Sequence, residues 1–422
     1  MLVLPSLAAV SPTGLPMPLD SATAGSSIPR GTVACLALAA FASGLSLRVN
    51  DALLPKLAEE FAVSLGEAAQ VISVFATAYG LAQLVFGPLG DRFGKYRVIA
   101  WASTACAATS LLCALAPGFE TLLVARAFAG MTAAAIIPLS MAWIGDVVAY
   151  DQRQPVLARF LIGQIAGLTT GVWLGGFAAD HLSWRVPYVL LVAIFAGVGL
   201  ALFAFNRRLP AHARLTRPGE GSPLRRIGPE LAAVLSQPWA RVILSLVFLE
   251  AFAFYGPFAF IATHVHRSFG LSLSNSGALV MLFGLGGFVF AVSSRRLVPR
   301  LRELGLARWG GVFMSTALLA IGFGPSWWWA LAGCFVAGLG FYMLHNTLQV
   351  NATQMVPERR GAAVSAFASC FFLGQSAGVS LGGWLVGRVG TALFLAFGAA
   401  GILAVALAFV SLLGKRAPAT HS

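Results

Sequence analysis

Charged residues are scarce in this chain of 422 residues. Asp, Glu, Lys and Arg together make up 10% of it, and the acidic residues number only 15. Because soluble domains carry about 25% charged residues, the composition excludes a chain that is water-exposed over its whole surface. The 58% share of hydrophobic residues indicates an integral membrane protein, with room for about a dozen apolar spans of ~20 residues.

Cysteine and the common catalytic motifs are also sparse or absent. The five cysteines all fall within apolar runs and show no CxxC spacing, which favours a packing role. The chain has no H-E-x-x-H and no complete phosphate-binding loop. We therefore expect neither an enzyme nor an ATP-driven pump, and we predict no cofactor and no metal site.

The net charge of +13 does not indicate a nucleic-acid-binding protein. Its basic residues lie in short loops between apolar runs and form no extended basic face, so no nucleic-acid partner is expected. Cytoplasmic loops of membrane proteins are enriched in Lys and Arg. With the N-terminus in the cytoplasm, most basic residues fall on the cytoplasmic side, and both termini are predicted to be cytoplasmic.

The apolar runs predict an all-α protein with twelve transmembrane helices in two pseudo-symmetric six-helix bundles. Residues 31–205 form the first bundle, 238–413 the second, and the Arg-rich segment 206–237 a cytoplasmic linker. Residues 1–30 and 414–422 are interpreted as cytoplasmic tails, the first of them flexible. The predicted spans are 31–55, 67–88, 97–116, 119–145, 156–180, 186–205, 238–262, 275–294, 307–324, 326–350, 361–386 and 390–413.

Two short matches indicate that the halves are copies of one unit. Residues 61–65 match residues 269–273 at an offset of 208, and residues 163–167 match residues 374–378 at an offset of 211. Each match falls at the equivalent place in its half, as a duplicated six-helix unit requires.

The stretch G-P-L-G-D-R-F-G-K, residues 87–95, joins the second and third predicted spans. Its glycines allow a tight turn and close helix approach, and Lys95 holds the turn on the cytoplasmic side. Asp91 needs a partner, and a helix N-terminus or a nearby Arg is the natural one. The stretch resembles the signature loop of the major facilitator superfamily. The residues assigned to this gating motif are Gly87, Gly90, Asp91, Arg92, Gly94 and Lys95.

Other segments extend the resemblance over most of the chain from about residue 31. Residues 122–130 are similar to the family's fourth-helix motif, although Ala129 stands where Gln is frequent. Residues 51–55 and the glycines between 163 and 176 resemble first-helix and fifth-helix motifs of drug/proton antiporters, with Val172 where a proline is usual. The resemblance implies that helices one, four, seven and ten line a central cavity, and that the two halves rock to expose it alternately.

Three ionisable residues within the predicted spans are candidate cavity or coupling residues. An ionisable group inside a span is costly and commonly functional. Arg126 either lines the cavity or forms a structural ion pair. Asp51 either takes part in proton coupling or pairs with Arg48 one turn before it. Glu250 has no basic residue near it in sequence, so we expect it to bind a proton or substrate.

The tenth predicted span carries further substrate-cavity candidates. Tyr342, Asn346 and Gln349 are spaced to lie on one helix face, beside His345. This polar stripe either lines the cavity or forms interhelical hydrogen bonds. Tyr255 belongs to an aromatic group in the seventh span that forms either an apolar binding wall or ordinary packing.

These observations and the resemblance predict a secondary transporter of the bacterial inner (plasma) membrane. It would move a small organic solute by alternating access, by proton-coupled efflux, and would function as a monomer in the lipid bilayer. Uptake by symport or facilitated diffusion is the alternative within transport. A non-transporting receptor or scaffold is the alternative from another class. We also expect Asp91 to lie near the start of the eleventh helix, close to Gly361, when the cytoplasmic side is closed.

Overall fold

The computed structural model describes residues 29, 31–148, 150–214 and 223–416, and helices make up almost all of that part. The expected N-terminal tail lies almost wholly outside the described residues, as does most of the C-terminal tail. The elements are α1 (Thr32–Arg48), α2 (Leu54–Glu60), α3 (Leu65–Ala68), α4 (Gln70–Phe93), α5 (Lys95–Ala114), α6 (Phe119–Ala133), α7 (Ile136–Val147), α8 (Tyr150–His181), α9 (Val186–Arg208), η1 (Ala211–Arg214), α10 (Pro223–Ser236), α11 (Pro238–Phe258), α12 (Ile261–Phe269), α13 (Leu273–Phe323), α14 (Trp327–Gln354), η2 (Pro357–Arg359) and α15 (Arg360–Arg416).

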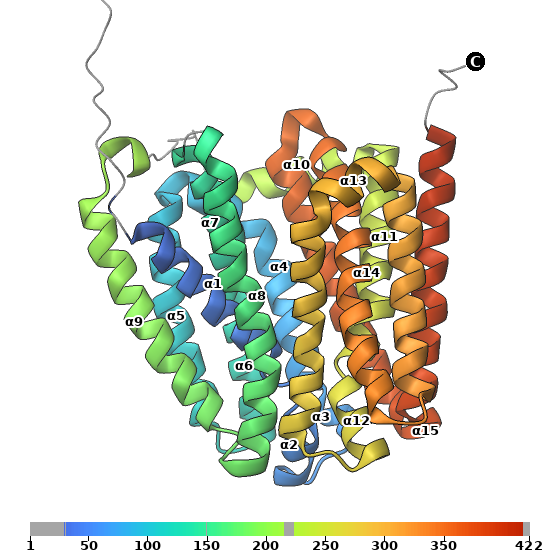
Figure 1. The fold of residues 1–422 in the computed structure, drawn as a ribbon. Helices are drawn as coiled ribbons and strands as arrows, with labels where there is room; N and C mark the ends of the chain where they lie inside the picture. The colour runs from blue at the N-terminus through green and yellow to red at the C-terminus, as the bar shows by residue number, and fades with distance from the viewer. Residues whose placement is uncertain (1–28, 30, 149, 215–222, 417–422) are drawn as a thin grey trace, which may run out of the picture.

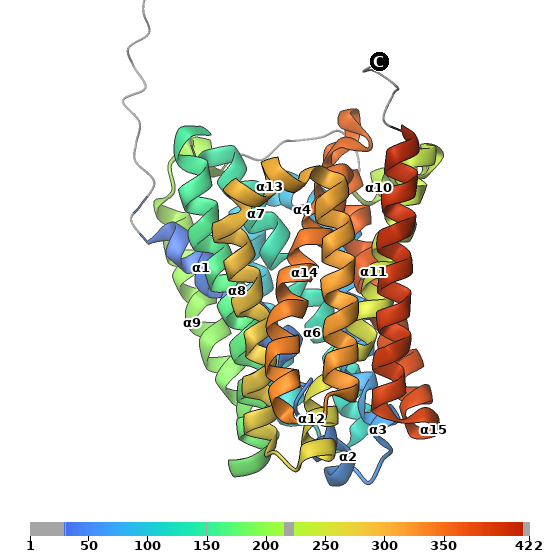
Figure 2. The same cartoon turned by 45° about the vertical axis from the view of Figure 1, so that its right-hand side comes forward.

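The long helices run side by side between two ends of the molecule, as Figures 1 and 2 show. We call the end that carries α10 the α10 end, and the opposite end, which carries α2, α3 and α12, the α2 end. Helices α1 to α9 form one half of the molecule and helices α11 to α15 the other. Helix α10 lies in the segment that was predicted to link them.

Nine helical segments within the described residues are long and apolar enough to cross a membrane. Two of these are hairpins, because Arg302 in α13 and Gly390 in α15 have non-helical backbone angles. The chain reverses direction there, at the α10 end and the α2 end respectively (Figure 1). The shorter apolar helix α1 precedes them. This segmentation is compatible with twelve crossings, and that number stays a prediction.

Three predicted spans are interrupted helices rather than continuous ones. The first ends at Arg48 before α2 begins, and the fourth breaks between α6 and α7. The seventh breaks after Phe258, directly behind Pro257. A proline lacks the N–H that an α-helix needs and its ring crowds the turn before it, which explains the break between α6 and α7, because Pro138 follows Ala134 by four residues.

The two halves repeat the same helix crossing. A Cβ on Gly167 of α8 would overlap the backbone of Phe41 in α1, and a Cβ on Gly378 of α15 would overlap the backbone of Phe252 in α11. Both members of the second pair lie 211 residues after their counterparts in the first. Glycine lets these helices approach backbone to backbone, so the sequence match reflects an equivalent contact in each half.

The other sequence match marks equivalent helix starts. The Ser64 hydroxyl accepts a hydrogen bond from the Glu67 backbone N–H at 3.1 Å, and the Ser272 hydroxyl accepts one from the Asn275 N–H at 3.1 Å. Both serines therefore cap the N-terminus of a helix, one at the start of α3 and the other at the start of α13.

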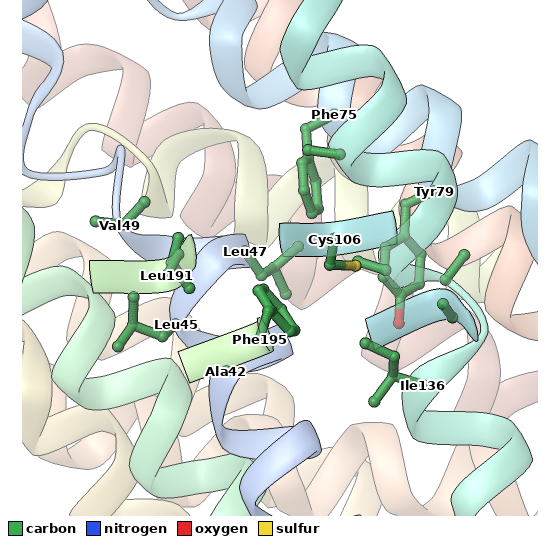
Figure 3. Packing of buried hydrophobic residues seen from close by; sticks show 14 of the residues in the cluster. Ala42, Leu45, Leu47, Val49, Phe75, Tyr79, Cys106, Ile136, Leu191 and Phe195 are labelled. Atoms are coloured by element: carbon green, nitrogen blue, oxygen red, sulfur yellow. The ribbon is translucent and has the colours of Figure 1, made fainter. Parts of the chain in front are cut away.

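Each half has its own apolar core. In the first half, side chains of α1, α4, α5 and α9 meet (Figure 3). Phe75 and Tyr79 of α4 face Cys106 of α5, while Leu191 and Phe195 come from α9. These clusters hold the helices of each half together, and the first also includes residues of the second half, namely Ala259, Phe260, Val379, Val386 and Phe394.

We expect Gly167→Ala to destabilise the protein and Gly197→Ala to leave its stability unchanged or slightly raised. The added methyl group would push α8 away from the Phe41 backbone, whereas nothing lies within 4 Å of a Cβ at Gly197. Overpacking typically costs about 1–3 kcal/mol, while Gly→Ala in an unobstructed helix gains about 0.5–1 kcal/mol. Thermal unfolding in detergent measures the stability of both variants. Equal melting temperatures would contradict the close crossing of α8 and α1 at Gly167.

Candidate functional site

The gating motif forms the turn between α4 and α5. Gly94 adopts a φ of 87° there, a left-handed conformation that glycine reaches without steric cost. The Asp91 carboxylate lies 2.9 Å from Lys95 Nζ, and the same nitrogen lies 2.8 Å from the Asp146 carboxylate at the end of α7. One lysine thus ties together the ends of three helices of the first half.

A cavity of about 460 Å³ opens beside this motif at the α10 end. Asp91 and Lys95 line it from the first half, Arg360 and Gly361 line it from the start of α15, and Glu230 lines it from α10. A Cβ on Gly361 would meet nothing within 4 Å. Asp91 and the N-terminus of α15 therefore share a cavity, but the ion pair of Asp91 in this conformation is with Lys95, and the contact with α15 stays a prediction for another conformation.

The two halves meet closely at the α2 end. A Cβ on Gly66 would overlap the backbone of Gly383, and a Cβ on Gly176 would overlap the backbone of Leu273. These backbone-to-backbone approaches join the first half to α15 and α13. The conformation is thus closed at the α2 end and hollowed at the α10 end.

Asp51 forms a buried ion pair with Arg48. Arg48 Nη1 lies 3.2 Å from Asp51 Oδ2, and the two side chains are 5% and 2% exposed. The Arg48 guanidinium also lies over the rings of Tyr255 and Phe258 in α11, at 4.2 and 5.1 Å from their centroids. Because a cation is attracted to an aromatic face, this pair connects the halves. The local salt bridge that the sequence left open is present, and a proton-coupling role of Asp51 stays a prediction.

Arg126 is held inside the first half. Its Nε donates to the Val71 carbonyl at 3.1 Å and its Nη1 to the Ser46 carbonyl at 3.2 Å, while the guanidinium lies 4.1 Å from the centroid of the Phe75 ring. The residue is 1% exposed. In this conformation Arg126 bridges α1, α4 and α6 through backbone carbonyls, and its Nη2 has no hydrogen-bond partner among the described residues.

Glu250 lies in α11 opposite His345 in α14. Glu250 Oε2 and His345 Nδ1 are 2.8 Å apart, and the carboxylate is fully buried. The imidazole stacks on Phe341 at 4.8 Å and meets Phe371 edge-on at 4.9 Å. Glu250 Oε1 has no partner within the described part of the chain. Two sequence candidates, 95 residues apart, thus form one buried acid–base pair.

The other candidates of α14 are less closely associated. Tyr342 is half-buried and packs on Phe283 and Phe341, Asn346 is half-buried, and Gln349 is exposed. Tyr255 contacts Phe341 as well as Arg48. A substrate-binding role for these residues stays a prediction. Among the described residues, no group of three or more His, Cys, Asp or Glu gathers as a metal site.

Sequence reasoning missed several contacts across the halves, among them those of Arg48 and Asp180. Arg48 was considered only as a neighbour of Asp51, and no sequence signal shows that its other face meets Tyr255. Asp180, at the end of α8, accepts hydrogen bonds from the start of α13. A carboxylate in the last turn of its own helix is electrostatically unfavourable there, and that position was a usable signal.

Comparison with known proteins agrees with this architecture. The family model of the Major Facilitator Superfamily matches residues 36–379. The chain belongs to the Major Facilitator Superfamily. It is similar to the uncharacterized MFS-type transporter YceJ of Bacillus subtilis (strain 168), with 27% identity over 82% of this chain and 86% of the relative. It is also similar to a protein of Mannheimia succiniciproducens named "Probable sugar efflux transporter", with 22% identity over 85% and 88% of the two chains.

Solved structures show the same fold. The human organic anion transporter MFSD10 (TETRAN) superimposes with a TM-score of 0.70 at 19% identity, over 90% of this chain and 98% of that one. The protein is therefore a multi-pass membrane transporter of this superfamily, and its all-helical fold is confirmed.

We expect Arg126→Lys to lower stability although it keeps the positive charge. A lysine cannot reproduce the two directed hydrogen bonds to the Val71 and Ser46 carbonyls, and unsatisfied buried groups cost about 1–3 kcal/mol each. Arg97→Lys is the matched control, because Arg97 is exposed and lies over Trp101 on the surface. Thermal unfolding in detergent should show a lower melting temperature for Arg126→Lys alone, and equal loss in both variants would count against the bridging role.

Proposed function

We propose that this protein exports a small organic solute across the bacterial inner membrane, driven by proton entry. The observation that carries the proposal is the buried pair of Glu250 and His345. A carboxylate with no water around it is costly as an anion, so the presence of a titratable partner gives it two low-cost states.

The pair can take up and release one proton without leaving the second half. In the proton-free state the carboxylate is ionised and its Oε2 accepts a hydrogen bond from a neutral imidazole, whose Nδ1 lies 2.8 Å away. Uptake of one proton by the carboxylate gives a neutral carboxyl group beside the neutral imidazole, and release of that proton restores the first state. Because Glu250 Oε1 is unpartnered among the described residues, it can accept a proton, or a donor group of the solute. Competition between the two at this oxygen would couple solute release to proton binding.

The α10 end is proposed to be the cytoplasmic end, since the basic segment around α10 lies there and cytoplasmic loops favour Lys and Arg. The cavity of about 460 Å³ then opens inward, as expected for a state that loads solute from the cytoplasm. The name of the Mannheimia relative, "Probable sugar efflux transporter", supports efflux as the direction. The chain is proposed to work as a monomer, with no enzymatic activity.

We expect Glu250→Gln to abolish solute-driven proton movement while solute exchange persists. The amide can still accept a hydrogen bond from His345, but it cannot carry a proton across. The measurement uses sealed vesicles that contain the purified protein and a trapped pH-sensitive dye. Solutes are first screened for proton movement with the wild type, and those found are then tested for exchange at equal pH on both sides.

Glu358→Gln is the control, because Glu358 is an exposed carboxylate at the α10 end. It should retain both activities. Full gradient-driven flux in Glu250→Gln would remove the residue as proton carrier, and flux without any proton movement in the wild type would favour facilitated diffusion. Proton movement that accompanies inward solute flux would favour symport. Binding of a solute without flux would favour a receptor.

A further inference from the structure

A second carboxylate of the first half contacts a helix of the second half, at the end opposite the gating motif. Asp180 lies in the last turn of α8. Its Oδ1 accepts from the Leu273 N–H at 3.2 Å, and its Oδ2 accepts from the Ser274 N–H and the Ser274 hydroxyl, both at 2.6 Å. These donors belong to the first turn of α13, so Asp180 caps a helix of the other half.

The position of Asp180 is unfavourable within its own helix. The C-terminal end of a helix carries partial negative charge, whereas the N-terminal end carries unpaired N–H groups and partial positive charge. An aspartate in the last turn of α8 is therefore repelled by α8 and attracted by α13. The contact with α13 compensates for the repulsion only while the two halves are together at the α2 end.

The same arrangement appears in the gating motif at the α10 end. Asp91 lies in the last turn of α4, four residues after Gly87, and Asp180 lies in the last turn of α8, four residues after Gly176. The Gly176 position touches the Leu273 backbone, while a Cβ on Gly87 would lie 3.8 Å from the Ser365 hydroxyl of α15. Each aspartate thus follows a glycine that faces a helix of the second half. The aspartate can cap the N-terminus of that same helix, which is α15 for Asp91 and α13 for Asp180.

We propose that Asp180 is a positioning residue of the transport cycle that holds the α2 end closed. Asp91 is its counterpart at the α10 end. In the conformation seen here, Asp180 caps α13, whereas an open cavity lies between Asp91 and the start of α15. When the halves rock, Asp180 loses its three donors and Asp91 gains those of α15. This inference rests on the alternating access between the halves that the proposed function includes. It does not depend on which solute is transported or on proton coupling.

The contact is exposed to solvent on one side, which sets its expected strength. Interactions of a carboxylate with a helix N-terminus at such positions shift an equilibrium by about two- to fivefold. Removing Asp180 should therefore raise the population that is open at the α2 end, relative to the closed one, by about two- to fivefold.

The test measures the distance between spin labels across the α2 end by double electron–electron resonance, in the full chain reconstituted in lipid nanodiscs. Labels are attached at Glu59→Cys in α2 and Arg267→Cys in α12, both exposed in the structure, after replacement of the native cysteines. Asp180→Ala should enrich the longer distance by the stated factor. Ser274→Ala, which removes one of the three donors and no charge, should shift it in the same direction by less.

Two further variants complete the design. Glu67→Gln is the matched control: Glu67 is also a carboxylate at a helix start on the α2 end, but it bonds only to Ser64 within its own half, so the distances should not change. Asp91→Asn should shift the same distance the opposite way, towards the closed α2 end. Unchanged distances in Asp180→Ala and Ser274→Ala, or an equal shift in Glu67→Gln, would overturn the proposal.

Failure of the proposed function would be visible separately. A protein that moves no solute or proton in vesicles can still show the shifted distances, because the labels report the position of the halves and not transport. Conversely, transport with normal distances in Asp180→Ala would leave the proposed function intact and remove Asp180 from the cycle.

Discussion

An ionised side chain at mid-membrane costs about 2.5–3.5 kcal/mol on translocon scales, so each buried charge of this protein must find its partner inside the bundle. Arg126 binds two backbone carbonyls, Arg48 pairs with Asp51, and Glu250 meets His345. These three ways of pairing a buried charge have different consequences for what the residue can do. Carbonyl partners cannot titrate, so Arg126 is suited to holding α1, α4 and α6 in place. An acid paired with an imidazole can change its protonation, which is why we propose Glu250 as the coupling residue.

Glycine determines where the halves and their helices touch. Gly167 and Gly378 bring equivalent helices together within each half, and Gly66 and Gly176 bring the halves together at the α2 end. Close backbone approach of this kind relies on van der Waals packing, since lipid supplies no hydrophobic driving force between helices. The halves also meet further along their helices, where the Thr77 hydroxyl of α4 lies 2.6 Å from the Ser376 hydroxyl of α15, so the interface in this conformation extends beyond the α2 end.

Sequence reasoning recovered what depends on local pattern. Apolar runs predicted the helices, and the glycine matches predicted the equivalent crossings, while the cytoplasmic linker assigned to residues 206–237 stays a prediction. It could not recover contacts that depend on the relative position of distant helices. Glu250 and His345 were both singled out, yet their pairing across 95 residues follows from how α11 packs on α14. Likewise, no spacing rule places Arg48 over Tyr255. The break between α6 and α7 was predictable from Pro138, which cannot donate to the carbonyl of Ala134 four residues before it, whereas the break after Phe258 has no such signal.

A carrier that alternates between two conformations needs closing contacts that are similar in strength at its two ends. If one end were held by a deeply buried ion pair, the loss of that pair would cost several kcal/mol and the other conformation would be scarcely populated. Exposed carboxylates that cap helix N-termini contribute only about 0.3–1 kcal/mol each. In the proposed cycle, Asp180 and Asp91 would each cap a helix of the second half, one at each end of the molecule. Their contributions to the two conformations would then nearly cancel, which would leave the balance to the solute and the proton that we propose to bind at the buried pair of Glu250 and His345.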